Sequence, residues 1–263
     1  MTSFRERYGP WAVVTGASAG LGACFARDLG ARGLDLVLVA RRADRLEQLA
    51  GEIRDAHRVE VRVVPVDLTA EGAPDRLRDA TAGLEVGLLV NNAGFGACSP
   101  FLDGEPARDA RMVRLNCEAV VAVAHAFLPT MAARGRGGMV VVASTASFQA
   151  TPWMSLYGAT KAFDLHLAEG LAVELAPRGV DVLALCPGHT ATEFHEVAGV
   201  TGPVAGGAAD PAVVVSGALD RLGRRRHWVP GWLNALMAWG TRLAPRRFVA
   251  GAAGRMLGSR LRP

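Results

Sequence analysis

The chain has 263 residues, of which 50% are apolar and 21% are charged, so it can bury a substantial core within one α/β domain. Its four cysteines are dispersed without a Cys-x-x-Cys pair, and its six histidines show no paired spacing, which argues against a metal centre or a disulfide framework. The first ten residues are polar and include no apolar stretch of signal-peptide length, so we expect a cytoplasmic protein with reduced cysteines.

The net charge of +4 is distributed unevenly along the chain. Residues 221–263 contain ten arginines and no acidic residue, which leaves residues 1–220 with a net charge of −6. Because the main body is mildly acidic and contains no recognised nucleic-acid-binding motif, we expect no nucleic-acid partner.

Short apolar runs alternate along the chain with longer stretches of helical apolar spacing. We predict strands at residues 11–15, 34–40, 59–66, 86–91, 139–144 and 180–186 and near Trp228, and helices at residues 21–31, 43–56, 107–133 and 157–176. Continuous apolar strands alternating with helices indicate a doubly wound parallel α/β sheet of about seven strands, with helices on both faces. We assign residues 1–222 to this domain and residues 223–263 to a basic extension of the same domain.

The first predicted strand leads directly into Thr15-Gly16-Ala17-Ser18-Ala19-Gly20-Leu21-Gly22 and then into a helix. In a dinucleotide-binding turn of the Rossmann type, Gly16 permits the tight turn, Gly20 lets the backbone approach a pyrophosphate, and Gly22 lets the helix pack closely on the strand. Backbone amides of the turn, which includes Ser18 and Leu21, and the helix N-terminus would hold the anion. A purely structural role for these glycines is the alternative.

The second predicted strand ends at Arg41-Arg42. A carboxylate at this point would bind the ribose hydroxyls of NAD, whereas an arginine pairs with the 2′-phosphate of NADP. Two guanidinium groups offer bidentate contacts to such a phosphate, so the pair predicts NADP(H) as the cofactor. A merely solvated Arg42 is the alternative.

Lys161 is the only lysine of the chain and follows Tyr157, one of only two tyrosines, by four residues. One helical turn separates them, so both lie on one face of the predicted helix. A compact ammonium, unlike a planar guanidinium, can lie close beneath a phenol and lower its pKa. The pair therefore predicts a general acid and base, with an exposed helix pair as the alternative.

From about residue 8 to residue 220, the motifs resemble those of the short-chain dehydrogenase/reductase (SDR) family. The matching residues occur in family order, namely the glycine turn, Asp67-Leu68, Asn91-Asn92-Ala93-Gly94, Asn116, Ser144, Tyr157, Lys161 and Pro187-Gly188. Arg41-Arg42, the sequence after the fourth strand and the basic tail look most like the branch of hydroxysteroid dehydrogenases and long-chain ketoacyl reductases. The resemblance implies a Rossmann-type SDR catalytic domain with oxidoreductase activity.

The resemblance also implies roles for individual residues. Tyr157 would be the general acid for carbonyl reduction and the base for alcohol oxidation, Lys161 would also bind the nicotinamide ribose, Ser144 would hold the substrate oxygen, and Asn116 would anchor a proton-relaying water. Asp67 would accept from the adenine amino group. The remaining cofactor contacts would come from Leu68, Asn91, Ala93, Gly94, Pro187, Gly188, Thr190 and Thr192. A turn-capping role for Asp67 and a loop role for Thr192 are alternatives.

The side chains expected to face the substrate, besides Ser144, are apolar: Phe95, Phe148, Trp153, Met154 and Phe194. They favour an apolar carbonyl or secondary alcohol, such as a lipid, acyl or steroid-like molecule. Core positions for most of these residues are the alternative. Residues 190–211 contain four glycines and two prolines among small residues and are predicted to form a loop.

The extension combines Trp228, Trp232 and Trp239 with apolar and arginine side chains. Its apolar stretch is shorter than the ~20 residues needed to span a bilayer, but it suits an interfacial helix on an anionic membrane surface. Dimer packing and capping of the pocket are the alternatives. The family resemblance implies a homodimer or homotetramer that forms through the helices beginning near Ala107 and Tyr157.

Two other functional classes compete with an NADP(H)-dependent oxidoreductase. The chain could be a catalytically idle nucleotide-binding interaction protein, although inactive relatives are expected to lose part of the Asn116, Ser144, Tyr157 and Lys161 set. It could also be an isomerase or dehydratase on the same scaffold, for which no distinguishing residue is visible.

Overall fold

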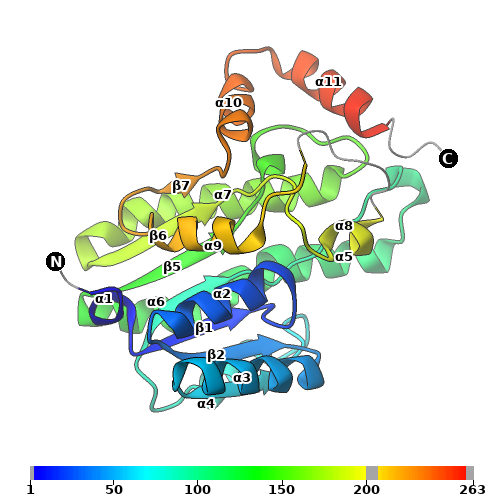
Figure 1. The fold of residues 1–263 in the computed structure, drawn as a ribbon. Coiled ribbons are helices and arrows are strands. Elements are labelled where there is room, and N and C mark those ends of the chain that lie inside the picture. Colours follow the sequence, from blue (N-terminus) through cyan, green and yellow to red (C-terminus); the bar gives the residue numbers. More distant parts are fainter. Residues whose placement is uncertain (1–2, 200–206, 259–263) are drawn as a thin grey trace.

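The computed structural model describes residues 3–199 and 207–258 and has a seven-stranded sheet at its centre (Figure 1). The strand order is β3-β2-β1-β4-β5-β6-β7, and every neighbouring pair is parallel. The strands are β1 (Trp11–Thr15), β2 (Asp35–Ala40), β3 (Val61–Pro65), β4 (Val86–Asn91), β5 (Gly137–Val142), β6 (Val180–Leu185) and β7 (His227–Trp228). The order reverses between β1 and β4, where such sheets open a crevice at the carboxyl ends of their strands.

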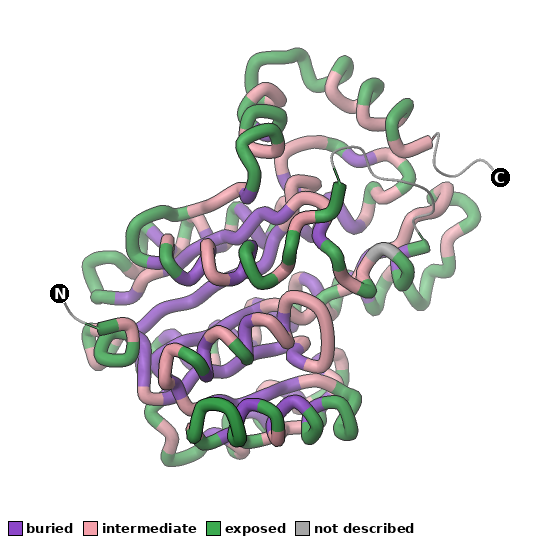
Figure 2. Tube along the Cα trace, in the orientation of Figure 1, coloured by how far each residue is buried: buried purple, intermediate pink, exposed green. Residues whose placement is uncertain are grey.

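Helices cover both faces of the sheet. One buried cluster joins it to α2 (Gly20–Ala31), α3 (Ala43–His57) and α9 (Pro211–Leu219). A second cluster joins the sheet to α4 (Ala73–Ala80), α6 (Ala119–Arg134) and α7 (Ser155–Leu175). Every residue of β1, β4 and β5 is buried between these layers (Figure 2), which explains why these strands are continuous apolar runs rather than alternating ones.

The predicted fold class is confirmed, and the predicted strand limits agree with the structure to within two residues. The predicted loop at residues 190–211 is wrong in part, because α8 (Phe194–Ala198) forms inside it, while residues 200–206 lie outside the described part of the chain. The predicted extension supplies β7, which pairs with β6. The extension therefore contributes the last strand of the sheet.

The predicted helix at residues 107–133 is divided into α5 (Pro106–Val113) and α6 by a π-helical turn, Arg114–Glu118. The whole stretch from Pro106 to Arg134 is long and apolar enough to span a bilayer. In the structure, however, Val123, Phe127 and Met131 of α6 belong to the buried core. Its apolar character is explained by packing on the sheet. The π turn carries Asn116, and such turns often occur at functional sites.

The C-terminal extension continues from β7 into α10 (Trp232–Gly240) and α11 (Arg246–Gly258). Both helices stand apart from the two helical layers (Figure 1). The remaining helix of the described chain, α1 (Phe4–Tyr8), precedes β1. Residues 241–245 separate the two helices of the extension.

Candidate active site

The ends of β1 and β4 are tied together by one buried hydroxyl group. Thr15 Oγ1 donates to the carbonyl of Val90 at 3.2 Å and accepts from the amides of Asn92 and Ala93 at 2.9 and 3.0 Å. The Asn92 side chain also donates to the Thr15 carbonyl at 2.9 Å. These bonds hold the loop after β4 beside the glycine turn after β1.

The glycine turn has the geometry expected of a dinucleotide-binding turn. Gly16 and Gly20 have φ angles of +67° and +55°, which residues with a Cβ adopt at a cost. A Cβ on Gly22 would lie 2.2 Å from the carbonyl oxygen of Gly16. Among the described residues, no side chain caps the first amides of α2, so the backbone donors of the turn fit an anion such as a pyrophosphate.

Arg42 lies beside the same turn. Its Nε and Nη2 donate to Ser18 Oγ at 3.2 and 3.0 Å, and its Nη1 pairs with Glu193 Oε2 at 3.4 Å. Arg41 is exposed and lies 4.0 Å from Asp67 Oδ2. Both arginines thus stand at the end of β2, where the sequence places them.

Asp67 caps the turn that follows β3. Its Oδ1 accepts from the Thr69 amide and hydroxyl at 3.0 and 2.7 Å, and its Oδ2 accepts from Arg111 at 2.7 Å. Burial alone would raise the pKa of Asp67, but the bonds from Thr69 and the charge of Arg111 lower it below the ordinary value. The turn-capping alternative is confirmed, whereas the adenine contact stays a prediction.

Two predicted cofactor residues direct their side chains into the protein. The Asn91 amide donates to the carbonyl of Val120 on α6 at 3.1 Å, and Leu68 belongs to the buried core. Asn91 is the last residue of β4, and its side chain points to the α6 face because side chains alternate along a strand. Both side chains are engaged in the protein interior, and the predicted cofactor contacts at these two positions stay predictions.

The segment after β6 carries four predicted cofactor residues. The carbonyl of Pro187 accepts from the amide of Thr145 at 3.0 Å, and Thr190 Oγ1 donates to the carbonyl of Gly188 at 3.2 Å. Thr192 reaches the glycine turn, because a Cβ on Gly20 would lie 3.3 Å from its Cβ. The segment therefore extends from the end of β6 across to the end of β1.

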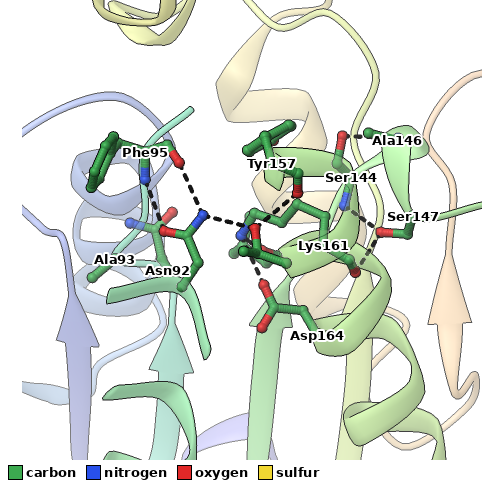
Figure 3. A network of polar contacts seen from close by, with 12 residues as sticks. Asn92, Ala93, Phe95, Ser144, Ala146, Ser147, Tyr157, Lys161 and Asp164 are labelled. Carbon is green, nitrogen blue, oxygen red and sulfur yellow. Dashed lines mark hydrogen bonds and ion pairs between the residues drawn. The ribbon is translucent and has the colours of Figure 1, made fainter. Parts of the chain in front are cut away.

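Tyr157 and Lys161 lie one turn apart on α7, beside the end of β5. They are 8% and 6% exposed, so the exposed-pair alternative is excluded. Lys161 Nζ donates to the carbonyl of Val142, the last residue of β5, at 2.7 Å and to Asp164 Oδ2 at 2.9 Å. Lys161 thus lies between Tyr157 and Asp164 (Figure 3).

Ser144 follows β5 and is held by its neighbours. Its hydroxyl accepts from the amide of Ala146 at 3.1 Å, and its amide donates to Ser147 Oγ at 3.3 Å. Ser147 Oγ in turn donates to the carbonyl of Lys161 at 2.7 Å. These bonds connect the turn after β5 to α7, so Ser144 and the Tyr157–Lys161 pair are positioned together.

Asn116 is fully buried in the π turn and bridges two segments of the site. Its Oδ1 accepts from the Phe95 amide at 3.1 Å, and its Nδ2 donates to the Phe95 carbonyl at 2.9 Å and to Thr160 Oγ1 at 3.0 Å. The Asn116 side chain therefore joins the loop after β4 to α7. Its predicted role as a water anchor stays a prediction.

Four effects act on the pKa of the Tyr157 phenol. Burial raises its pKa most, Lys161 and a hydrogen bond with Ser144 lower it, and Asp164 raises it again, so that its pKa lies above the ordinary value. The sequence predicts a lowered pKa from Lys161. The ammonium acts in that direction, but within the chain itself burial outweighs it.

Phe194, one of the predicted substrate residues, packs its aromatic ring beside the Tyr157 phenol, with the two centroids 5.3 Å apart. Trp153 and Met154 line one pocket together with Phe101 and Met112. Phe148 instead packs against the core and lies 6.2 Å from the ring of His227.

Phe148 therefore takes the core position that was the alternative. Phe95 is placed beside the catalytic set by the bonds of its backbone to Asn116. Trp153 has a φ of +71° and donates from Nε1 to the carbonyl of Gly254 on α11 at 3.0 Å. That bond brings the C-terminal extension to the substrate side, as the pocket-capping alternative requires.

Sequence reasoning missed several residues that build the site. Thr15 and Asn92 join β1 to β4, Ser147 joins Ser144 to α7, and Asp164 pairs with Lys161. The acid three residues after the only lysine was a visible signal for Asp164, because side chains three apart on a helix are neighbours. Thr15 and Asn92 lie inside the motifs quoted above, without a role of their own being predicted, whereas Ser147 carries no signal in a single sequence.

A model of the short chain dehydrogenase family matches residues 10–199. The chain belongs to that family. The 7beta-hydroxysteroid dehydrogenase of Clostridium sardiniense is 33% identical over 233 residues, which cover 88% of this chain and 89% of that protein. The very-long-chain 3-oxoacyl-CoA reductase of Anas platyrhynchos is 36% identical over 195 residues, which cover 72% of this chain and 62% of that protein.

Solved structures agree with this assignment. A short-chain dehydrogenase from Sphingobium yanoikuyae in complex with NADPH superposes with a TM-score of 0.81 at 33% identity, covering 97% of each chain. As a short-chain dehydrogenase, the protein is a Rossmann-type oxidoreductase of alcohol and carbonyl groups. Members of this family typically use NAD(P)H, and the Sphingobium relative contains NADPH. The roles of the glycine turn and of the Tyr157–Lys161 pair in that chemistry stay predictions.

Proposed function

We propose that the protein is an NADP(H)-dependent reductase that interconverts an apolar carbonyl compound and its secondary alcohol. The observation that carries this proposal is the buried Tyr157–Lys161 pair beside the end of β5, with Ser144 held next to it by the turn after that strand. Tyr157 is placed to exchange a proton at the substrate oxygen, and Ser144 to hold that oxygen.

In the reduction, the Ser144 hydroxyl orients the carbonyl oxygen, and the Tyr157 phenol donates its proton to that oxygen. The bound nicotinamide would supply the hydride to the carbonyl carbon or, in the oxidation, accept it from the alcohol carbon. Lys161 stabilises the phenolate that remains, because its ammonium is buried nearby. Burial alone would lower the pKa of Lys161, but Asp164 and Tyr157 raise it above the ordinary value. Burial of the site strengthens each of these interactions.

The preference for NADP(H) is supported by Arg41 and Arg42 and by the NADPH-bound structural relative. Replacing both arginines by glutamine should raise the Michaelis constant for NADPH on the order of tenfold to a hundredfold, because charge-assisted hydrogen bonds to the phosphate are lost. The constant for NADH should change little. Arg45→Gln, which removes the other partner of Glu193, is the matched control, and equal effects on both cofactors would reject the assignment.

An apolar substrate is supported by Phe194, whose ring lies beside that of Tyr157. The named relatives act on hydroxysteroids and on very-long-chain oxoacyl-CoA, which fits a bulky apolar molecule. Turnover of steroid ketones and medium-chain ketones should exceed turnover of small sugars and keto acids. Preference for the sugars or keto acids would contradict this substrate class.

The same assay separates the competing classes. An oxidoreductase consumes NADPH in proportion to the alcohol formed, an isomerase or dehydratase converts substrate with no net loss of NADPH, and an idle nucleotide-binding protein does neither. The buried Tyr157–Lys161 pair supports the first outcome. Loss of NADPH absorbance in the wild type but not in Tyr157→Phe is the expected result.

We further infer a cytoplasmic protein that contacts an anionic membrane surface through α10. This helix directs large side chains outward, with Trp232 80%, Leu236 53% and Met237 55% exposed, and buries the small Ala238. Exposed arginines follow in the next segment. Apolar side chains beside cationic ones are typical of an interfacial helix.

Co-sedimentation with vesicles tests this inference. Binding should be stronger to anionic than to neutral vesicles, should fall with added salt, and should be lost in Trp232→Ser/Leu236→Ser. Val213→Ser, which removes an exposed apolar side chain from α9, is the control. The alternative is that a second copy of the chain covers α10. In that case the wild type self-associates and does not bind vesicles, and the Trp232→Ser/Leu236→Ser variant is monomeric.

The homodimer or homotetramer implied by the family stays a proposal. Phe163 and Val173 on α7 are 39% and 53% exposed, which supports a contact through this helix. Light scattering should give a multiple of the monomer mass, and Phe163→Arg/Val173→Arg should reduce that mass.

A further inference from the structure

Asp164 is a buried carboxylate that the mechanism above leaves without a role. It lies on α7 at 1% exposure, and its Oδ2 accepts from Lys161 Nζ at 2.9 Å (Figure 3). Its other oxygen, Oδ1, is buried with no hydrogen-bond partner among the described residues. A buried carboxylate with one unbonded oxygen is costly, so its place beside the only lysine calls for an explanation.

The geometry of Lys161 depends on this carboxylate. An ammonium has three N–H donors, and two of them are directed by Val142 and Asp164. These two acceptors come from different elements, β5 and α7, so they fix Nζ in direction as well as in distance. The third donor is left for the nicotinamide ribose that Lys161 is expected to bind.

The carboxylate also changes the charge that Tyr157 experiences. Among the described residues, Lys161 and Asp164 are the charged groups that act on the phenol, in opposite directions. The other titratable groups near the pair are thiols, Cys117 on the π turn and Cys186 after β6. Burial raises the pKa of Cys117 to about 11 and that of Cys186 to about 12, so both are neutral at physiological pH.

We propose that Asp164 is a positioning residue that orients Lys161 and, by offsetting part of its charge, limits how strongly the ammonium favours the phenolate of Tyr157. The proposal rests on the proposed function for its meaning, since a protonated phenol is the acid that reduction needs and a phenolate is the base that oxidation needs. It adds that Asp164 extends the pH range of carbonyl reduction upward.

The titration of Tyr157 itself tests this without any substrate. The chain has two tyrosines, so NMR of an isotope-labelled tyrosine ring carbon shows two signals, and Tyr157→Phe assigns them. The other tyrosine, Tyr8, donates its hydroxyl to Asp181 at 2.7 Å, and its signal is the one that remains in Tyr157→Phe. The titration is run with the protein alone and with NADP⁺ added.

Asp164→Asn should lower the pKa of Tyr157 by about one unit, because it removes a nearby negative charge and leaves the ammonium. Asp164→Glu keeps the charge and should shift this pKa much less. Asp28→Asn, which removes the partner of Arg32 on α2, is the matched control and should leave it unchanged. An unchanged pKa in Asp164→Asn, or an equal shift in Asp28→Asn, overturns the proposal.

Activity provides the second readout. In Asp164→Asn, the pH dependence of alcohol oxidation should move about one unit toward acid, since the phenolate forms at lower pH, and reduction should fall at a lower pH than in the wild type. A purely structural role would lower the melting temperature without moving either profile. If Asp164→Asn does not fold, Asp164→Leu serves as the second variant.

The two proposals fail in different ways. If the wild type reduces no carbonyl compound, the proposed function is rejected, whereas the NMR titration still decides the effect of Asp164 on Tyr157. If the wild type is an active reductase and the Tyr157 titration is the same with and without Asp164, only the role of Asp164 is rejected.

Discussion

The nucleotide side and the substrate side of this short-chain dehydrogenase are built from different kinds of contact. On the nucleotide side, Thr15, Asn92 and the glycine turn are fixed by backbone groups of β1 and β4. On the substrate side, α11 has no fully buried residue, and the carbonyl of its Gly254 accepts a hydrogen bond from Trp153. Several hydrogen bonds between neighbouring strand ends hold the nucleotide side together, while the extension meets the body at the bond between the Trp153 side chain and the Gly254 carbonyl. We therefore expect changes at the extension to affect cofactor binding little.

The largest expected effect is on kcat and comes from Lys161, where the nucleotide side and the substrate side meet. Lys161→Arg keeps the charge, but a planar guanidinium does not fit the buried position between Val142 and Asp164. We expect kcat to fall on the order of a hundredfold or more, in line with the loss of an acid–base contribution. Steady-state kinetics with NADPH measures it, with Arg108→Lys on exposed α5 as the control. Near-normal turnover would remove Lys161 from the mechanism.

The rigidity of the nucleotide side is tested by a pair of glycine substitutions. Gly22→Ala should weaken NADPH binding by more than about tenfold, because its Cβ would collide with the Gly16 carbonyl and displace the turn. Gly51→Ala, on α3, has open space for a Cβ and should be neutral or stabilise the protein by up to ~1 kcal/mol. Fluorescence titration with NADPH and thermal melting give the two values. A similar loss in both variants would mean that the turn is not the binding element.

Loss of the hydrogen bond between Trp153 and the extension is expected to have a smaller effect, on the Michaelis constant for the substrate. Trp153→Phe removes the bond to the Gly254 carbonyl and should raise the Michaelis constant for an apolar ketone roughly fivefold, the size of one hydrogen bond. The constant for NADPH should be unchanged. Trp239→Phe, at an exposed position of α10, is the control. If NADPH binding weakens as much as ketone binding, the two sides are not independent.

Features set by neighbours in the chain could be predicted from the sequence. The strands follow from continuous apolar runs, the cofactor turn from the glycines after β1, and the Tyr157–Lys161 pair from a four-residue spacing. The inward side chain of Asn91 and the core position of Phe148 could not be predicted, because each is decided by an element distant in the sequence, α6 and the sheet core respectively.

By itself, the sequence determined the family, the parallel sheet and the location of the catalytic set, because periodicity and short motifs express local geometry. Only the tertiary structure decided which polar and charged groups meet. It brought Glu193 to Arg42 and Gly254 to Trp153 across long separations, and it buried Asp164 against Lys161. Burial is what turns that last pair from an ordinary surface contact into an influence on Tyr157, since charges act strongly only where water is excluded.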